Sequence, residues 1–291
     1  MSPAGFGDLP AGFADPASAE IAVLPVPYDR TSTWMKGADR GPQAIIEASH
    51  QVEWFDIPTA TEVYRRGIAT LDPVLCEEGP ERLADLVDER VAGLLADGVL
   101  PVVLGGEHSV SIGAIRAAAR LLPGVSVLQI DAHADTREEY QGSRFNHACV
   151  MARVREWCPV VQVGIRAVDI SEIAGLVPHR VFWAHEIAAA GPSDTTWMDD
   201  AVSPLGDAVW VTLDLDGFDP SVLPATGTPE PGGLDWYQVI GLLERVARRR
   251  RVIGFDVVEL LPSEEHWASS FLAAKLVYRF LSMIFAYRSS G

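Results

Sequence analysis

Residues 125–135 of the chain are Val125-Ser126-Val127-Leu128-Gln129-Ile130-Asp131-Ala132-His133-Ala134-Asp135. It begins as a short apolar run, typical of a buried strand, and continues directly into acids and an imidazole. Further apolar runs follow along the chain and alternate with segments rich in Ala, Leu, Arg and Glu. Apolar strands that alternate with helices are typical of a parallel sheet covered by helices on both faces. The sequence therefore predicts an α/β fold.

The predicted strands cover residues 21–25, 100–104, 125–130, 160–163, 180–183, 209–215 and 252–258. The predicted helices cover residues 80–97, 112–122, 148–157 and 235–249. The Pro/Gly-dense segment 220–233 is incompatible with a helix or a central strand, so we expect an ordered loop after a strand end. Because no linker divides the chain, we expect an N-terminal arm over residues 1–19 and one domain over residues 20–291.

The charge balance limits the partners. The chain has 291 residues with 23 Lys and Arg against 40 Asp and Glu, a formal net charge of −17. Such a surface repels nucleic acid and anionic membranes and suits a small cationic ligand. The run Arg248-Arg249-Arg250-Arg251 is interpreted as the end of a helix, where cations complement the helix dipole, and not as a nucleic-acid patch.

The cysteines and the apolar segments indicate the compartment. Cys76, Cys149 and Cys158 are few and show no C-x-x-C spacing, so neither a disulfide framework nor a thiolate zinc site is indicated. The N-terminus does not resemble a signal peptide, and we expect a cytoplasmic protein. The apolar segment 267–287 carries Lys275 and Arg279, which favours a buried C-terminal helix over a membrane span.

Three residues directly after the quoted strand are candidate metal ligands. If the extended conformation continues, the period of two directs Asp131, His133 and Asp135 to the same side. The alternative is a helix cap with solvated loop acids, which would be the better interpretation of a single Asp. For Asp-x-His-x-Asp at the end of an apolar strand, metal binding is the favoured interpretation.

Two other strand ends repeat this pattern. Asp214 and Asp216 follow the apolar run 209–213, and His108 follows Gly105 and Gly106 after another buried run. With the first group they form a set of four carboxylates and two imidazoles without a thiolate. These oxygen and nitrogen ligands are harder, in the sense of hard and soft ligands, than those that structural zinc prefers. Six of them can hold two divalent ions, and manganese is the first expectation. Two ions can share a water molecule and lower its pKa.

The chain resembles the ureohydrolase family, which includes arginase and agmatinase. The resemblance rests on three motifs in the family's order, and it extends from Thr31 to Glu259 through the segment 227–233. The motifs are Gly105-Gly106-Glu107-His108-Ser109, Asp131-Ala132-His133-Ala134-Asp135-Thr136 and Asp214-Leu215-Asp216-Gly217-Phe218-Asp219-Pro220. The resemblance implies a three-layer α/β/α sandwich around a predominantly parallel sheet and a homotrimer or homohexamer.

The resemblance also implies roles for individual residues. It assigns two manganese ions per subunit to six ligands: His108 and Asp135 on one ion, His133 and Asp216 on the other, with Asp131 and Asp214 bridging. Glu259 matches a glutamate that pairs with the substrate guanidinium. His147 matches a mobile proton-shuttling histidine, with a structural loop histidine as the alternative. The implied reaction is attack of activated water on the guanidinium carbon, with a proton relay through Asp135 and His147 to the departing amine.

The segment after Asp135 departs from arginase, so L-arginine is not the expected substrate. Agmatine is the main expectation, with aminopropylagmatine or 4-guanidinobutyrate as alternatives. Asp169 aligns with an arginase acid that contacts the substrate amino group. Glu138 and Glu139 are further candidates for binding an amine, whereas Arg137 and Arg144 would suit a carboxylate.

Two rival classes remain at this point. A single-zinc deacetylase shares the broad fold and an Asp-x-His pair but lacks the second set of ligands. A ureohydrolase-like binding protein without activity is the other rival, against which the complete ligand set and Glu259 argue.

Overall fold

The computed structural model describes residues 5–288 and contains a central sheet of eight parallel strands. The strand order is β2-β1-β3-β8-β7-β4-β5-β6. The strands are β1 (Ile21–Val26), β2 (Ile68–Thr70), β3 (Leu100–Gly105), β4 (Ser126–Ile130), β5 (Val160–Ile165), β6 (Val181–Trp183), β7 (Ala208–Asp214) and β8 (Arg251–Val258). Every pairing within this sheet is parallel, as the apolar runs predicted.

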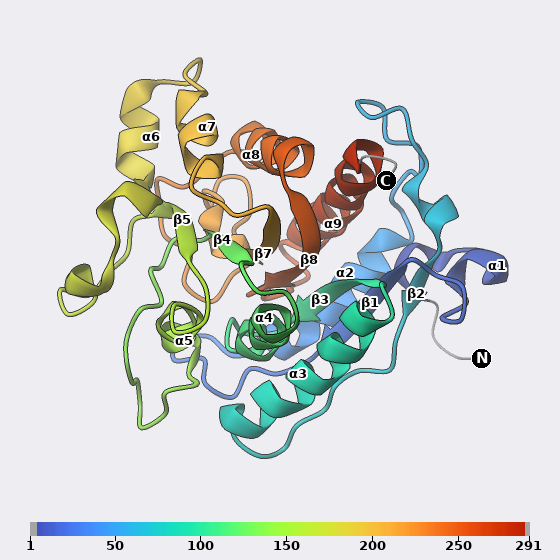
Figure 1. Cartoon of the computed structure of the whole chain (residues 1–291), viewed down its shortest axis with the longest axis horizontal. Helices are drawn as coiled ribbons and strands as arrows, with labels where there is room; N and C mark the ends of the chain where they lie inside the picture. Colours follow the sequence, from blue (N-terminus) through green and yellow to red (C-terminus); the bar gives the residue numbers. More distant parts are fainter. Residues whose placement is uncertain (1–4, 289–291) are drawn as a thin grey trace.

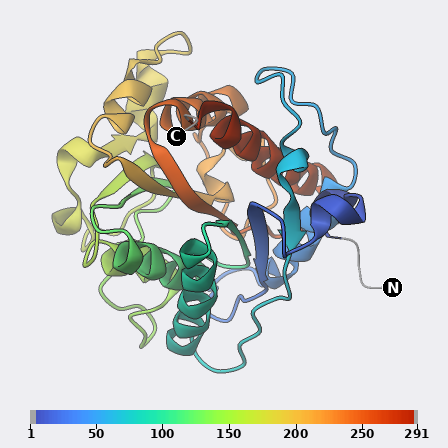
Figure 2. The ribbon, with the colours of Figure 1, turned by 45° about the vertical axis from the view of Figure 1, so that its right-hand side comes forward.

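Helices cover both faces of the sheet. They are α1 (Ala11–Ala14), α2 (Gly41–Ser49), α3 (Pro80–Ala96), α4 (Val110–Leu121), α5 (Val150–Val154), α6 (Ala184–Ala190), α7 (Thr196–Val202), α8 (Trp236–Arg249) and α9 (Trp267–Tyr287). Helices α3, α4 and α5 pack on one face, and α2, α7, α8 and α9 pack on the other (Figure 1). Turned by 45°, the molecule shows the dark red α9 and the green α4 on opposite sides of the strands (Figure 2). The three-layer α/β/α arrangement is confirmed.

Each face of the sheet has its own core because alternate side chains of a strand point to opposite faces. In β7, Val209 and Val211 enter the core under α8 and α9, whereas Trp210 enters the core under α3 and α4. This double burial explains why the strands are apolar runs without polar alternation.

Several elements differ from the prediction. The edge strand β2 and the helices α2, α6 and α7 were not predicted, because they are short. The helix predicted over residues 148–157 is shorter: a 3-10 turn at His147–Cys149 precedes α5, which ends at Val154. The strand predicted over residues 209–215 ends at Asp214, because Leu215 begins a 3-10 turn capped by the Asp214 side chain.

Helix α9 is buried, as predicted. By length and composition it could cross a membrane, with a mean hydropathy of 1.3, but 67% of its apolar window is buried inside the fold. Arg279 forms a buried ion pair with Asp56, and the Ser282 hydroxyl donates to the Tyr278 carbonyl oxygen at 2.9 Å. Arg279 and Ser282 of α9 therefore find partners inside the protein.

The strand register brings distant residues to one edge of the sheet. Ile130 pairs with Leu213, so Asp131 and Asp214 follow side by side at the carboxyl ends of β4 and β7. Asp214 itself pairs with Val258, which places Glu259 directly beyond the end of β8. Ligand sites of open α/β sheets lie at this edge.

Candidate metal centre

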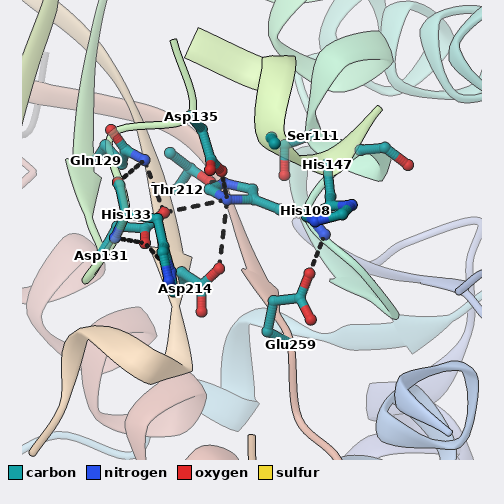
Figure 3. A network of polar contacts seen from close by, with 12 residues as sticks. His108, Ser111, Gln129, Asp131, His133, Asp135, His147, Thr212, Asp214 and Glu259 are labelled. Atoms are coloured by element: carbon teal, nitrogen blue, oxygen red, sulfur yellow. Dashed lines mark hydrogen bonds and ion pairs between the residues drawn. The ribbon is translucent and has the colours of Figure 1, made fainter. Parts of the chain in front are cut away.

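His108 points into a group of carboxylates at the end of β3 (Figure 3). Its Nδ1 lies 3.1 Å from an oxygen of Asp131, 2.9 Å from one of Asp135 and 3.3 Å from one of Asp214. No hydrogen bond of suitable geometry reaches this buried nitrogen from any described residue. The arrangement fits a nitrogen and three carboxylate oxygens that face a common cation.

The opposite side of the His108 ring is held by a buried hydrogen-bond chain. Nε2 lies 2.9 Å from the Thr212 hydroxyl, and this hydroxyl donates to Asp256 Oδ1 at 2.6 Å. Since the Thr212 proton goes to Asp256, the Thr212 hydroxyl accepts from Nε2–H of His108, and Nδ1 is the ring nitrogen that would bind a cation. Metal-binding histidines are commonly oriented by such partners on the other ring nitrogen.

A second histidine, in the loop after β4, shares Asp131 with His108. His133 Nδ1 lies 2.9 Å from Asp216 Oδ2 and 3.7 Å from Asp131 Oδ1. Two groups of ligand atoms result, each within 4.8 Å: one from His108, Asp131 and Asp135, the other from Asp131, His133 and Asp216. Asp131 belongs to both groups, so the geometry suits two neighbouring ions.

The electrostatics of the cluster favour bound cations. Burial and the charges of Asp216 and Asp135 raise the pKa of Asp131 to about 7. Burial and the neighbouring carboxylates also raise the pKa of Asp214 well above its ordinary value. Burial opposes the charged form of His133, but the adjacent carboxylates outweigh it and raise its pKa to about 11. Divalent ions would neutralise the same carboxylates that otherwise retain protons.

The backbone reaches this geometry by a different path from the predicted one. Strand β4 ends at Ile130, and Asp135 adopts a left-handed backbone with φ of 52°. The Asp135 carbonyl accepts the amides of Met151 and Ala152 at 2.9 and 3.2 Å, which ties this turn to α5. The continued extended strand was therefore wrong, although its three side chains do converge.

Glu259 also has a strained backbone, with φ of 66°. Its amide donates to the Gly106 carbonyl at 2.7 Å, and its Oε1 accepts the His108 amide at 2.7 Å. Burial and the charge of Glu107 raise the pKa of Glu259 to about 8. Residues other than glycine rarely adopt the left-handed backbone conformation, yet Asp135 and Glu259 of this one site both adopt it.

His147 is held by Thr31 and Glu107. The Thr31 hydroxyl donates to Glu107 Oε1 at 2.5 Å and lies 3.1 Å from His147 Nδ1. Because the hydroxyl has one proton, it accepts from Nδ1–H, which leaves Nε2 of His147 unprotonated. Burial lowers the pKa of His147, whereas the charge of Asp135 opposes this shift. The neutral ring is therefore favoured.

These groups line an open pocket of about 360 Å³. Its floor contains His108, His133, Asp135, Asp214, Asp216 and Glu259, together with His147 at one side. The remaining wall includes Trp34, Met35, Arg137, Tyr140, Asp169, Glu172, Thr228 and Glu230. Asp169 therefore lies at the pocket, as the sequence suggested.

The other candidate tail-binding residues lie elsewhere. Glu138, Glu139 and Arg144 are exposed and do not line the pocket. Glu138 forms ion pairs with Arg153 and Arg155, and Arg144 pairs with Glu156 at 3.0 Å. Only Arg137 of the predicted cationic candidates reaches the pocket wall.

The structure confirms that several polar residues have structural roles. Asp219 Oδ1 accepts the Ser221 amide, and Oδ2 accepts the amides of Gly232 and Gly233, so this acid fastens the Pro/Gly loop. Burial raises the pKa of the Cys149 thiol to about 12, which agrees with core packing. Arg248 and Arg249 occupy the last turn of α8.

Sequence reasoning missed the residues that support the site. Thr212 and Asp256 lie inside apolar strands, where a polar residue at a buried position was the available signal. Glu107 lies inside a quoted motif, and Thr31 marks the beginning of the resemblance, yet no pattern indicated their contact with His147. Glu230 is part of the Pro/Gly loop, and only its negative charge set it apart.

The Arginase family model matches residues 19–282 of this chain. The N(1)-aminopropylagmatine ureohydrolase of Synechocystis sp. is 38% identical in an alignment of 277 residues that covers 91% of this chain and 89% of the relative. The protein of the same name from Thermus thermophilus is 39% identical over 96% of this chain and 94% of its own length. The crystal structure of agmatine ureohydrolase of Thermoplasma volcanium has a TM-score of 0.87 at 31% identity, covering 99% of this chain and 96% of that one.

Proposed function

This chain belongs to the arginase family, and we propose that it hydrolyses the guanidinium group of N1-aminopropylagmatine to urea and a free polyamine. Family membership makes it a hydrolase that acts on guanidino groups and depends on metal. The observation that supports the chemistry is the pair of ligand groups that share Asp131 beneath an acidic pocket. The substrate is proposed from the names of the relatives in Synechocystis and Thermus. Agmatine, the main expectation from sequence, becomes the second candidate.

Six side chains would hold two Mn²⁺ ions: His108, Asp131, His133, Asp135, Asp214 and Asp216. Their oxygen and nitrogen donors, without thiolate, fit a hard divalent ion. When bound, such a pair of ions supplies a nucleophile from water at neutral pH and neutralises the carboxylate cluster. A single-zinc enzyme would use fewer of these six ligands.

Glu259 positions the substrate guanidinium in this proposal. Its Oε1 is fixed by the His108 amide, so Oε2 remains for the planar cation. Gly227 leaves space beside this oxygen, since a Cβ at that position would lie 4.0 Å from Glu259 Oε2. The guanidinium therefore lies over the floor with its carbon open to attack by water.

His147 and Asp135 transfer protons in this proposal. The Thr31 contact leaves Nε2 of His147 free to accept a proton. Water adds to the guanidinium carbon, the bond from carbon to the substituted nitrogen breaks, and both protons of water pass to that nitrogen. The products are urea and a protonated amine, so atoms and charge balance. Asp135 and His147 relay these protons from the floor of the pocket to the departing amine.

Asp169 binds the amine nearest to the guanidinium in this proposal. It lies on the pocket wall, and its Oδ1 is fixed by the amide and hydroxyl of Ser171 at 2.9 and 2.6 Å. A carboxylate at this position suits the ammonium groups of agmatine and its aminopropyl derivative better than 4-guanidinobutyrate, which has a carboxylate in place of the amine.

Assembly and location complete the proposal. A homotrimer or homohexamer is proposed from the family resemblance alone. A cytoplasmic location is supported by the three cysteines, all of which are free thiols.

The test is urea release by manganese-loaded protein from aminopropylagmatine, agmatine, 4-guanidinobutyrate and L-arginine, with metal content measured in parallel. We expect two manganese ions per chain and the highest kcat/KM for aminopropylagmatine. A higher kcat/KM for agmatine would contradict the substrate assignment. Bound metal without urea from any of these compounds would favour a binding protein over an enzyme.

A further inference from the structure

The carboxylates that line the pocket divide by what they already contact. They are Asp135, Asp169, Glu172, Asp214, Asp216, Glu230 and Glu259. Asp135, Asp214 and Asp216 face the two histidines of the floor, and Glu259 holds the His108 amide. In the proposed function these four carboxylates bind the metal ions or the guanidinium group, so they are not available to the other end of the substrate.

Two carboxylates of the wall are engaged by their own surroundings. Glu172 is buried, and its Oε1 accepts the Thr136 amide at 2.8 Å while Oε2 accepts the Asp169 amide at 3.0 Å. Asp169 uses Oδ1 for Ser171, and its Oδ2 lies 3.9 Å from Arg137. Arg137 also lies 3.5 Å from Glu172, so it partly neutralises both acids.

Glu230 is the exception among these acids. Within residues 5–288 its carboxylate has neither a hydrogen bond nor an ion pair, although it lines the same pocket. The side chain is half-buried and therefore partly shielded from solvent. A free, partly desolvated carboxylate in a pocket is a suitable receptor for a cation.

The backbone of Glu230 is held in place from two sides. Arg166 donates from Nε and Nη2 to the Glu230 carbonyl at 3.2 and 2.8 Å, and Nη2 also donates to the Asp216 carbonyl at 2.6 Å. On the other side, Asp219 accepts the amides of Gly232 and Gly233 at 2.8 and 3.0 Å. Arg166 thus connects the loop of Glu230 directly to the metal-site loop. This bracing presents the carboxylate at a fixed place relative to the floor.

From this geometry we infer that Glu230 is the receptor for the distal ammonium group of an aminopropyl-extended substrate. The inference rests on the proposed function and extends it to one residue. Aminopropylagmatine carries one more ammonium group than agmatine, so it needs one more carboxylate than Glu259 and Asp169 supply. Glu230 is the wall carboxylate without another partner, and it lies on a braced loop of the same pocket.

The test compares Glu230→Gln with the parent enzyme on two substrates, both loaded with manganese. Gln keeps the size of the side chain and removes its charge. Loss of a charge-assisted contact should raise the KM for aminopropylagmatine about tenfold and change the KM for agmatine less than about twofold. The kcat values should stay close to those of the parent enzyme, because Glu230 does not contact the reacting atoms.

Glu89→Gln is the matched control, because Glu89 is exposed on α3 and does not line the pocket. It should leave both KM values unchanged. An unchanged KM for aminopropylagmatine in Glu230→Gln would overturn the inference, and so would an equal rise for both substrates, which would place Glu230 on the shared amine. If the parent enzyme does not prefer aminopropylagmatine, the proposed function fails, whatever the variant shows.

Discussion

The floor and the wall of the pocket use the same residue types in opposite ways. At and directly beneath the floor, Asp214 and Asp131 are buried with raised pKa values, and His108 Nδ1 lies 3.3 and 3.1 Å from their carboxylates. On the wall, Glu172 and Asp169 are hydrogen-bonded by their own loop and lie near Arg137. The floor therefore requires added cations, whereas Glu172 and Asp169 of the wall already have partners, and Glu230 is the wall acid that has none within residues 5–288. In the proposed function, the first region carries the chemistry and the second selects the substrate.

Loss of a floor ligand should have the largest effect. We expect His133→Ala or Asp214→Ala to abolish tight manganese binding and urea release together. The fall in activity should exceed the roughly 100-fold typical of losing a partner outside the ligand set. Metal analysis and a urea assay on the same samples test this, with the exposed Asp200→Asn as control. Full activity in either ligand variant would contradict the assignment of the floor.

Substitution of Asp256 tests whether metal binding at the floor depends on the buried hydrogen bonds that orient His108. Its Oδ2 accepts the Trp210 indole N–H at 2.6 Å, and its Oδ1 accepts the hydroxyls of Thr212 and Ser111. In Asp256→Asn an amide N–H₂ group faces these donors, so Thr212 can no longer fix His108. We expect manganese affinity to fall roughly 10-fold to 100-fold.

The measurement for Asp256→Asn is a manganese titration, with KM at saturating metal as a second readout. A floor defect should leave the KM for substrate nearly unchanged once metal is saturating. A raised KM with normal metal affinity would instead mean that the variant disturbs the wall.

Metal removal should make stability depend on pH in a defined direction. In the folded protein without metal the pKa is about 7 for Asp131, about 8 for Glu259 and about 11 for His133, against 3.8, 4.5 and 6.5 in their ordinary state. The folded state therefore binds more protons than the unfolded state across this range, and stability falls as the pH rises through the folded values. The lowered pKa values of Asp216 and His147 oppose this below their ordinary values of 3.8 and 6.5.

Melting curves test this linkage between about pH 6 and about pH 9. The melting temperature of the metal-free protein should fall by a few degrees over this interval. Bound manganese replaces the protons, so the stabilisation by metal should grow with pH. A metal-free protein that becomes more stable toward alkaline pH would contradict the raised pKa values.

The contrast between floor and wall also explains which parts of the fold and of the site could be predicted from the sequence. Asp131, His133 and Asp214 were predictable as ligands because they lie in short motifs at strand ends. The parallel register of β4 and β7 then brings these strand ends together. The short strand β2 was not, since Ile68-Ala69-Thr70 has too few residues to show a period. Glu230 was not, because its place depends on Arg166 and Asp219, which are distant in sequence. Local pattern determines the floor, and tertiary contacts between loops determine the wall.

Substitution of Glu139 should have the smallest effect, and it tests whether the pocket wall includes the loop after Asp135. It lies four residues after Asp135, and the sequence made it a candidate for binding the substrate amine. In the structure it is exposed and does not line the pocket. Glu139→Gln should therefore change the KM for either substrate less than about twofold and the free energy of unfolding by less than about 0.5 kcal/mol. Steady-state kinetics and a denaturant titration test this. A tenfold rise in KM would mean that the loop after Asp135 closes over the substrate, and the wall would then extend beyond the residues that line it here.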